Sequence, residues 1–265
     1  MIPFPDINPV ALHIGFFKLH WYGISYLLGI GLGWYYLERR ARTRLSNLSQ
    51  INVSDLVFYI ALGAVLGGRL GYILFYNLPA YYDDPFSIFA VWKGGMSFHG
   101  GVVGVMFVLV WQSRKLGESI LTLGDFFLPA LPIGLGLGRL ANFVNQELWG
   151  SPTDLPWGVV FTVPGAGGLS RHPTQLYEAV LEGLVLFLIL HFMGKRRLQK
   201  GQITGMFLVL YGCFRSLVEL VREPDAHIGY LYSDWFTMGQ LLCGPMIVAG
   251  LFITFVCYTR KRSAG

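Results

Sequence analysis

Seven long apolar stretches divide this sequence, and each is long enough to cross a lipid bilayer as a helix. A spanning helix needs about 20 predominantly apolar residues, because each residue adds about 1.5 Å and the hydrocarbon core is about 30 Å thick. The sequence therefore predicts an all-α, polytopic membrane protein with about seven transmembrane helices. The stretches lie at about 19–37, 54–76, 97–113, 122–141, 175–193, 202–221 and 235–258.

The low share of charged residues supports the same fold class. The 265 residues are 54% hydrophobic and 13% charged, whereas about a quarter of the residues in a soluble domain are charged. No Lys or Arg precedes Lys18, so the basic segment that opens a secretory signal peptide is missing. We accordingly expect the first apolar stretch to remain in the protein as a helix.

The basic residues indicate how the helices are oriented. Most of the 20 Lys and Arg residues follow the first, third, fifth and seventh stretches, and cytoplasmic connections carry the excess of such residues. This pattern predicts a periplasmic N-terminus and a cytoplasmic C-terminus, and it explains the net charge of +5 without a nucleic-acid partner. We predict a single transmembrane domain over residues 1–265. The longest outward connection, 142–174, is expected to form a small periplasmic cap or a flexible loop.

Two of the stretches are irregular. The third is strongly apolar only over 102–111, and the segment 98–101 before it could be a re-entrant or interfacial piece. The fourth contains Pro129 and Pro132, and proline removes a helical hydrogen bond and bends the helix. A kink is therefore expected in the fourth helix.

Polar residues gather at one level of the predicted helices. An ionisable group near the bilayer centre costs about 2.5–3.5 kcal/mol on insertion scales, so such residues mark functional or paired sites. With the predicted topology they lie in the outer half of the membrane and predict one polar cavity there. Asp125, near the inner end of the fourth stretch, is the exception. The outer set comprises Tyr22, Arg69, His99, Arg139, Asn142, Asn145, Glu178, Arg215, Glu219 and Asp234.

Three arginines of this set suit an anionic ligand. The guanidinium groups of Arg69, Arg139 and Arg215 could donate paired hydrogen bonds to a phosphate. The structural alternative is a buried pair between an arginine and a glutamate, and Arg215 and Glu219 have the i,i+4 spacing that allows it. For each single arginine both interpretations stay open, while the cluster with a histidine and two asparagines favours a functional site.

Other patterns exclude several kinds of site. The three cysteines lie in apolar stretches without CxxC spacing. His99 and His172 have no cysteine or carboxylate neighbours at metal-ligand spacing, and the alternate glycines within 134–138 follow no predicted strand, unlike a dinucleotide loop. We therefore predict no metal and no cofactor. Close helix packing is instead expected at these glycines, and also at Gly29, Gly33, Gly63 and Gly67.

The segment 138–150, which reads GRLANFVNQELWG, resembles the signature of the prolipoprotein diacylglyceryl transferases: a Gly-Arg, an Asn-Phe, then Asn-x-Glu and a Gly. A match of this length is highly specific. The resemblance extends over nearly the whole chain and is weakest at about 151–170. Further matching segments are HWYG at 20–23, GGRLGY at 67–72, GMSFHGG at 95–101, RHPTQLYE at 171–178, FRSLVE at 214–219, REPD at 222–225 and SDWFTMGQ at 233–240.

The resemblance implies an enzyme of the bacterial inner membrane. That family transfers the diacylglyceryl group of phosphatidylglycerol to the thiol of the lipobox cysteine in a prolipoprotein signal peptide. The products are a thioether-linked lipid and glycerol phosphate, and the reaction takes place at the periplasmic side, as the first step of lipoprotein maturation. Because the substrate supplies the nucleophile, the enzyme needs no cysteine of its own.

The resemblance also implies site residues. The family's essential histidine falls on His99, its signature arginine and asparagine on Arg139 and Asn142, and its second lipid-handling arginine on Arg215. The two arginines are expected to hold the phosphate as negative charge develops. His99 is expected to accept the thiol proton, to hydrogen-bond the headgroup, or to have only a structural role in its glycine-rich turn. Further positions assigned to catalysis or substrate binding are Tyr22, Glu147, Glu219, Arg69, Asn145, Gly150 and Tyr211.

The neighbouring carboxylates are expected to have a supporting role. Glu147, Glu178 and Glu219 are predicted to orient arginines rather than to accept protons. On helical spacing, Arg139 and Asn142 share one face of the fourth helix. The predicted site is therefore a set of positioned cations and amides at one level of the membrane.

Three other functions are alternatives to a transferase of this kind. An outer-leaflet transporter of anionic lipid would also use a polar cavity, but the polar residues do not continue to the inner face and no inverted repeat is visible. A lipid-binding scaffold would bind phosphatidylglycerol without turnover. Another transferase that uses phosphatidylglycerol would differ only in its acceptor.

Overall fold

The computed structural model describes residues 1–15, 17–42, 48, 51–78, 84–90, 94–196, 198–224, 229–232 and 235–263. Two compact units make up the chain. Unit 1 comprises Met1–Leu37 with Asp125–Gly265, and unit 2 comprises Glu38–Gly124. Each unit is described by itself, and the single domain over 1–265 stays a prediction. Asp234, one of the predicted cavity residues, lies outside the described residues.

The structure is mostly helical, with a long helical segment at each of the seven predicted stretches. Within the described residues, four segments are long and apolar enough to cross a membrane: Val53–Tyr76, Ile120–Val144, Thr174–Met193 and Met238–Thr259. The described chain is therefore a helical protein of the membrane-embedded kind. Its helices are α1 (Trp21–Ala41), α2 (Val53–Tyr76), η1 (Pro85–Phe89), α4 (Phe98–Leu116), α5 (Ile120–Phe127), η3 (Leu128–Ala130), α6 (Leu131–Val144), η4 (Pro164–Ala166), α7 (Thr174–Glu178), η5 (Ala179–Val185), α8 (Leu186–Met193), α9 (Gln202–Glu219) and α10 (Met238–Ser263).

Glycines bring α2 and α4 of unit 2 into close contact. A Cβ atom added at Gly67 would lie 2.4 Å from the carbonyl oxygen of Gly100, and one at Gly104 would lie 2.0 Å from that of Gly63. No side chain fits at such distances, so these positions keep the two backbones together, as small residues do between membrane helices. The predicted packing role of Gly63 and Gly67 is confirmed.

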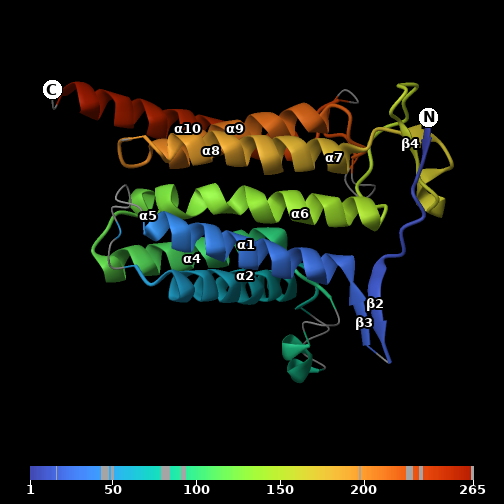
Figure 1. Cartoon of the computed structure of the whole chain (residues 1–265), viewed down its shortest axis with the longest axis horizontal. Helices are drawn as coiled ribbons and strands as arrows, with labels where there is room; N and C mark the ends of the chain where they lie inside the picture. The colour runs from blue at the N-terminus through green and yellow to red at the C-terminus, as the bar shows by residue number, and fades with distance from the viewer. Residues whose placement is uncertain are drawn as a thin grey trace. The chain divides into compact units, whose positions relative to one another are not determined.

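Glycines also allow close contact between the helices of unit 1. A Cβ atom at Gly29 on α1 would lie 3.1 Å from Cα of Gly134 on α6, and one at Gly183 on η5 would lie 2.7 Å from Cα of Gly136. The helix α9 packs directly against α10 and also contacts α8 (Figure 1). The outward side of α10 is apolar and exposed, as at Phe252 (67% exposed), which suits contact with lipid.

Asp125, the exception among the predicted polar residues, caps a helix. Its carboxylate accepts hydrogen bonds from the backbone N–H of Gly201 at 2.6 Å and from the N–H and hydroxyl of Thr204 at 2.7 and 2.8 Å. The first N–H groups of a helix have no partner within the helix itself. A carboxylate from α5 therefore satisfies the start of α9 and also complements its dipole.

Two helices depart from regular α-geometry. The predicted kink of the fourth helix is confirmed, because the 3₁₀ turn η3 with Pro129 separates α5 from α6. The fifth helix contains the π-helical turn η5, which was not predicted. The segment 98–101 forms the first turn of the continuous helix α4, where the hydroxyl of Ser97 accepts a hydrogen bond from the N–H of Gly100 at 3.2 Å.

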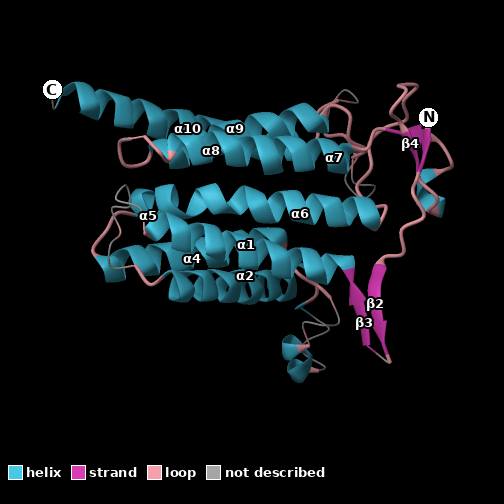
Figure 2. Ribbon diagram, viewed as in Figure 1, coloured by secondary structure: helices cyan, strands magenta, loops and turns pink. Residues whose placement is uncertain are grey.

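Five short strands complete the fold, and the all-α prediction did not include them. The strands β2 and β3 form an antiparallel hairpin before α1, and β1 lies beside β4 (Figure 2). In the three-stranded sheet the order is β1-β4-β5, and it packs Phe4 against Phe161 in the buried core of the predicted cap. The strands are β1 (Ile2–Pro3), β2 (Val10–Ile14), β3 (Phe17–His20), β4 (Val159–Val160) and β5 (Ser170–Arg171).

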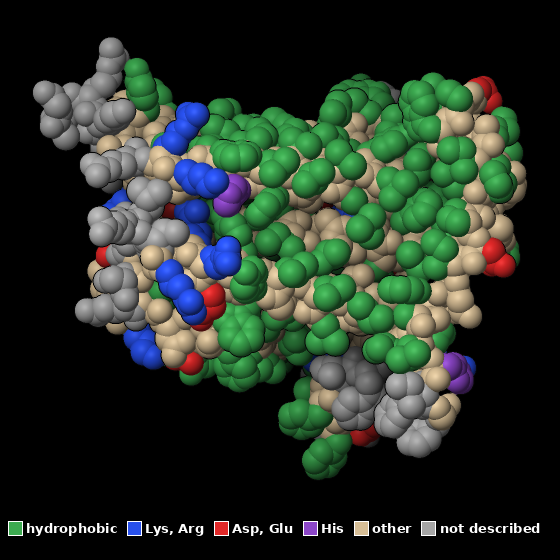
Figure 3. Space-filling view, in the orientation of Figure 1, with side chains coloured by type: hydrophobic (Ala, Val, Ile, Leu, Met, Phe, Trp, Pro, Cys, Tyr) green, Lys and Arg blue, Asp and Glu red, His purple; other side chains and the backbone are tan. Residues whose placement is uncertain are grey.

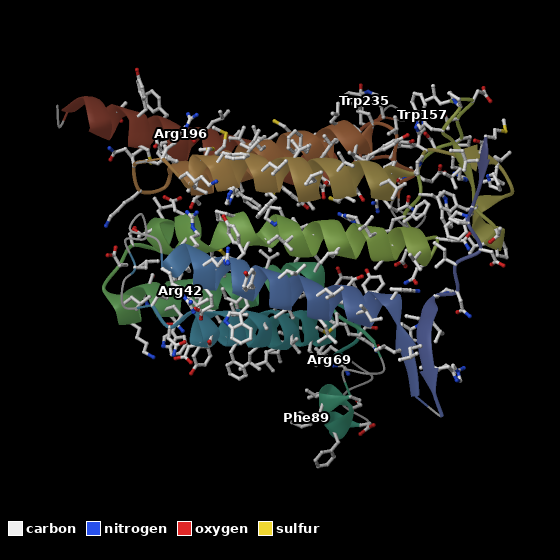
Figure 4. All side chains as sticks on the ribbon, in the orientation of Figure 1. Arg42, Arg69, Phe89, Trp157, Arg196 and Trp235 are labelled. Carbon is white, nitrogen blue, oxygen red and sulfur yellow. The ribbon has the colours of Figure 1, made fainter. Side chains whose placement is uncertain are left out.

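The two ends of unit 1 differ in chemistry. Arg196, after α8, lies at the opposite end of the unit from Trp157 and Trp235 (Figure 4). Over α8 and α10, hydrophobic side chains cover the middle of the visible face, and Lys and Arg gather near the end of α8 (Figure 3). A basic end, an apolar middle and an aromatic end are typical of a protein that lies across a bilayer.

Candidate functional site

The central feature of unit 1 is a group of buried arginines and glutamates, here called the ion-pair cluster. It is built from α6, the α7–η5 segment and α9, each of which contributes residues from a different part of the sequence. Three positive charges face three negative ones when all are ionised, so the cluster is formally neutral. Its members are Arg139, Arg215, Arg222, Glu178, Glu182 and Glu219.

Glu178 is the centre of the cluster. Its side chain is fully buried, and all three arginines of the cluster reach it. Oε2 lies 3.2 Å from Nε of Arg139, and Oε1 lies 3.3 Å from Nη1 of Arg222. Nη1 of Arg215 donates to the same Oε1. One carboxylate therefore orients three cations, from α6, from α9 and from the turn after α9, which agrees with the orienting role predicted for Glu178.

The other two carboxylates hold the outer nitrogens of the arginines. Nη2 of Arg215 lies 2.8 Å from Oε2 of Glu219, so the i,i+4 pair that the sequence offered as the structural alternative is present. The other oxygen of Glu219 accepts a hydrogen bond from the hydroxyl of Thr237 at 3.0 Å. Nη2 of Arg139 lies 3.5 Å from Oε2 of Glu182. Contacts to more than one carboxylate thus fix the orientation of each guanidinium group.

The arginines are the accessible part of the cluster. The side chains of Arg139 and Arg215 are 18% and 14% exposed, whereas those of Glu178 and Glu182 are fully buried. A ligand that approaches the cluster therefore meets guanidinium groups first. An anion with several acceptor oxygens, such as a phosphate, is the group that this surface suits.

Asn142 lies one turn after Arg139 on α6, as the predicted spacing requires. Its Nδ2 donates to the hydroxyl of Tyr22 at 3.0 Å and to Oε1 of Glu147 at 2.8 Å. The backbone carbonyl of Glu147 accepts in turn from Nε2 of Gln175 at 2.6 Å. Three predicted site residues are thus brought together, and Glu147 orients an amide rather than an arginine.

The loop after α6 has an unusual backbone. Asn145 ends the helix, and Gln146 and Leu148 take positive φ angles of 53° and 62°. Non-glycine residues rarely adopt this conformation, and it concentrates at functional sites. A Cβ atom at Gly150 would lie 2.4 Å from the carbonyl oxygen of Val221, so a glycine is required where this loop meets the end of α9.

Arg222 and Tyr211 connect this loop and α9 to the cluster. Gly150 and Arg222 form an isolated β-bridge, which places the backbone of the loop against the end of α9. Burial and the charge of Arg215 lower the pKa of the Arg222 guanidinium. Tyr211 lies one turn before Arg215 on α9 and stacks on Phe207, with ring centroids 5.8 Å apart.

Unit 2 contains two further predicted site residues. Arg69 is 5% exposed, and its guanidinium donates to the backbone carbonyls of Ser87, Ile88 and Gly94 at 2.7, 3.0 and 2.6 Å. Arg69 thus holds the connection that carries Phe89 (Figure 4). His99 lies in the first turn of α4, where its ring is exposed. The predicted substrate contact of Arg69 stays a prediction, while its observed contacts are to backbone.

The cap contributes a second arginine site, outside the helices. Arg171 donates to the carbonyls of Ala166 at 2.8 Å and Gly150 at 3.1 Å and pairs with Glu223 at 2.9 Å. Its neighbour His172 lies 3.2 Å from the hydroxyl of Tyr177, and partial burial lowers the pKa of the imidazole. These contacts tie the cap to the signature loop.

Sequence reasoning missed part of the cluster. Glu182 and Thr237 were not identified as site residues, and Arg222 was named only within the matching segment at 222–225. A signal for Glu182 was present, because Glu178 and Glu182 are i,i+4 neighbours in an apolar stretch. Among the described residues, His, Cys, Asp and Glu form no group of three or more that could hold a metal ion.

The fold and the site define a class: a helical, membrane-embedded protein with buried, carboxylate-oriented arginines. The comparisons with known proteins are more specific. The family described as "Prolipoprotein diacylglyceryl transferase" matches residues 9–256. The chain therefore belongs to the prolipoprotein diacylglyceryl transferase family.

Similar proteins cover the whole chain. A protein of Pseudomonas fluorescens (strain Pf0-1) is 50% identical over 265 residues, which is 100% of this chain and 98% of that protein. A protein of Pseudomonas putida (strain W619) matches with the same identity and the same coverage. Both are named phosphatidylglycerol--prolipoprotein diacylglyceryl transferase.

Proposed function

We propose that this chain transfers the diacylglyceryl group of phosphatidylglycerol to the thiol of the lipobox cysteine in a prolipoprotein signal peptide. The observation that carries the proposal is the full-length match to relatives named for this activity, at 50% identity. The ion-pair cluster supports it independently, because it presents Arg139 and Arg215 from buried carboxylates. Those are the two arginines that the family resemblance assigns to the lipid.

The reaction exchanges one bond for another at a single carbon. The thiolate sulfur attacks the glycerol carbon that carries the phosphate, a carbon–sulfur bond forms, and the carbon–oxygen bond breaks. The bonding electrons leave with glycerol phosphate, and the thiol proton goes to a base or to the departing phosphate. Negative charge therefore grows on the phosphate oxygens, and positioned arginines lower the barrier by stabilising it.

The remaining residues have positioning or proton-transfer roles. His99 accepts the proton of the substrate thiol, whose ordinary pKa is about 8.5, or it hydrogen-bonds the headgroup. Asn142, Tyr22 and Glu147 form one hydrogen-bonded set beside Arg139 on α6. This set orients the lipid headgroup or the peptide at the start of the signature loop.

The protein lies in the bacterial inner membrane with seven spans and its active site toward the periplasm. Three observations support this orientation: the basic connections, the basic end of unit 1 at Arg196, and the aromatic end at Trp157 and Trp235 (Figure 4). The ordered cap then lies in the periplasm, where the prolipoprotein arrives. The parts of the signal peptide other than its lipobox cysteine bind to this cap and to the lipid-facing helices.

The test uses purified protein in vesicles of phosphatidylglycerol with a synthetic lipobox peptide. Mass spectrometry of the peptide should detect a diacylglyceryl adduct on cysteine, and glycerol phosphate should appear in equal amount. A Cys→Ser peptide and an Arg139→Ala variant should give no adduct. Lipid that binds or crosses the membrane without an adduct would instead indicate a scaffold or a transporter.

A further inference from the structure

Glu182 differs from the other carboxylates of the ion-pair cluster. It lies in the π-helical turn η5 and its side chain is fully buried. Neither carboxylate oxygen has a hydrogen-bond partner within the described part of the chain. Its ion pair with Nη2 of Arg139 is 3.5 Å long. Glu182 is thus a buried carboxylate with fewer polar contacts than Glu178 and Glu219.

Among the described residues, Glu178 and Glu219 each have one oxygen without a hydrogen-bond partner, whereas Glu182 has two. Glu178 contacts all three arginines of the cluster. Glu219 contacts Arg215 at 2.8 Å and also accepts a hydrogen bond from Thr237. A buried carboxylate without such bonds is costly in free energy. A buried carboxylate that lowers stability and yet is present at a candidate site is expected to have a role in the function of that site.

The close contact between the backbones of η5 and α6 fixes the position of Glu182. A Cβ atom at Gly183 would lie 2.7 Å from Cα of Gly136, so η5 and α6 are in direct contact beside Arg139. A π-helical turn shifts the side chains that follow it around the helix and is frequent at functional sites. The local fold therefore directs this carboxylate at one nitrogen of Arg139.

We propose that Glu182 is the counter-ion that Arg139 gives up when the lipid phosphate binds. This inference rests on the proposed function. Before the lipid arrives, Glu182 positions Nη2 of Arg139; when the lipid is bound, the phosphate takes its place as the partner of that nitrogen. Because the cluster is formally neutral, the incoming phosphate adds a negative charge beside Glu182. Glu182 therefore weakens binding of the anion and speeds release of the more highly charged product, glycerol phosphate.

The test removes the negative charge of Glu182 and keeps the size and shape of its side chain. In Glu182→Gln, we expect the KM for phosphatidylglycerol to fall about tenfold, because a negative charge within a few ångströms of the phosphate is removed. We expect kcat to fall as well, by about threefold, because product release slows. Glu182→Met, which needs no buried hydrogen-bond partner, should change both parameters in the same direction. A matched control is Glu38→Gln, which removes an exposed pair with Arg42 and should change neither.

A binding measurement decides the inference without turnover. Glycerol phosphate is titrated into each purified protein in phosphatidylcholine nanodiscs, and both Glu182 variants should bind it about tenfold more tightly than the wild type. Equal or weaker binding by a folded variant would overturn the inference, as would a lower kcat with an unchanged KM. Absence of turnover by the wild-type protein would refute the proposed function but leave this titration valid.

Discussion

The start of α9 depends on one carboxylate from another helix, and its removal should be measurable. Asp125 accepts three hydrogen bonds, from the backbone N–H of Gly201 and from the N–H and hydroxyl of Thr204, at 2.6–2.8 Å. A hydrogen bond to a charged group contributes about 1.5–3 kcal/mol, and bonds that share one carboxylate are not additive. We expect Asp125→Ala to lower the free energy of unfolding by about 3 kcal/mol. Because α9 carries Arg215, transferase activity should fall with stability.

The assay is thermal unfolding in detergent, with transferase activity measured on the same samples. A loss of about 3 kcal/mol corresponds to a fall in Tm of about 6–12 °C for a chain of this size. Asp125→Asn keeps one acceptor oxygen and should lose about half as much. Asp154→Ala, which removes an exposed aspartate of the cap, is the control. If Asp125→Ala unfolds at the same temperature as this control, the capping argument is wrong.

Four further changes test other parts of the structure. Glu178→Gln should lower kcat/KM at least about a hundredfold, because three arginines lose the charge that orients them; unchanged kinetics would contradict this. Gly104→Leu should separate α2 from α4 and lower Tm by several degrees, whereas an unchanged Tm would refute their close contact. Arg69→Lys should speed amide hydrogen exchange in 84–90, since the single ammonium nitrogen of a lysine cannot reach all the carbonyls that the three nitrogens of the guanidinium reach; equal exchange would contradict this anchoring. Burial lowers the pKa of His172, so its contribution to stability is complete above about pH 6.5 and is lost as the pH falls through the lowered pKa. Tm should therefore fall less between pH 7 and pH 5 in His172→Gln than in the wild type.

The helices could be predicted from the sequence because the bilayer demands long apolar segments with internally bonded backbones. The proline break at Pro129 was predictable for the same local reason. The strands of the cap were not, since β1, β4 and β5 have two residues each, and β1 exists through pairing with a segment about 157 residues away, as between Ile2 and Val159. The π-helical turn η5 likewise depends on its packing against α6.

The contacts of the site also differ in how far they could be predicted. Contacts within one helix follow from the sequence, and contacts between distant segments do not. The Arg215–Glu219 pair and the shared face of Arg139 and Asn142 follow from helical spacing alone. The contacts of Glu178 join residues 37 and 44 positions apart, and no local pattern indicates them. Arg69 shows the limit most clearly, because burial in an apolar stretch suggested a phosphate ligand and its observed partners are loop carbonyls.

The central claim is that a thiolate displaces a phosphate held by Arg139 and Arg215 from the glycerol carbon. The most direct test uses phosphatidylglycerol labelled with ¹⁸O at the oxygen between the diacylglycerol carbon and phosphorus. Both products are analysed by mass spectrometry after reaction with a lipobox peptide. The account predicts that all of the label leaves in glycerol phosphate and that the peptide adduct contains none. Labelled free diacylglycerol, together with a phosphoglycerol group on the peptide sulfur, would show that the phosphorus–oxygen bond breaks and would contradict this mechanism.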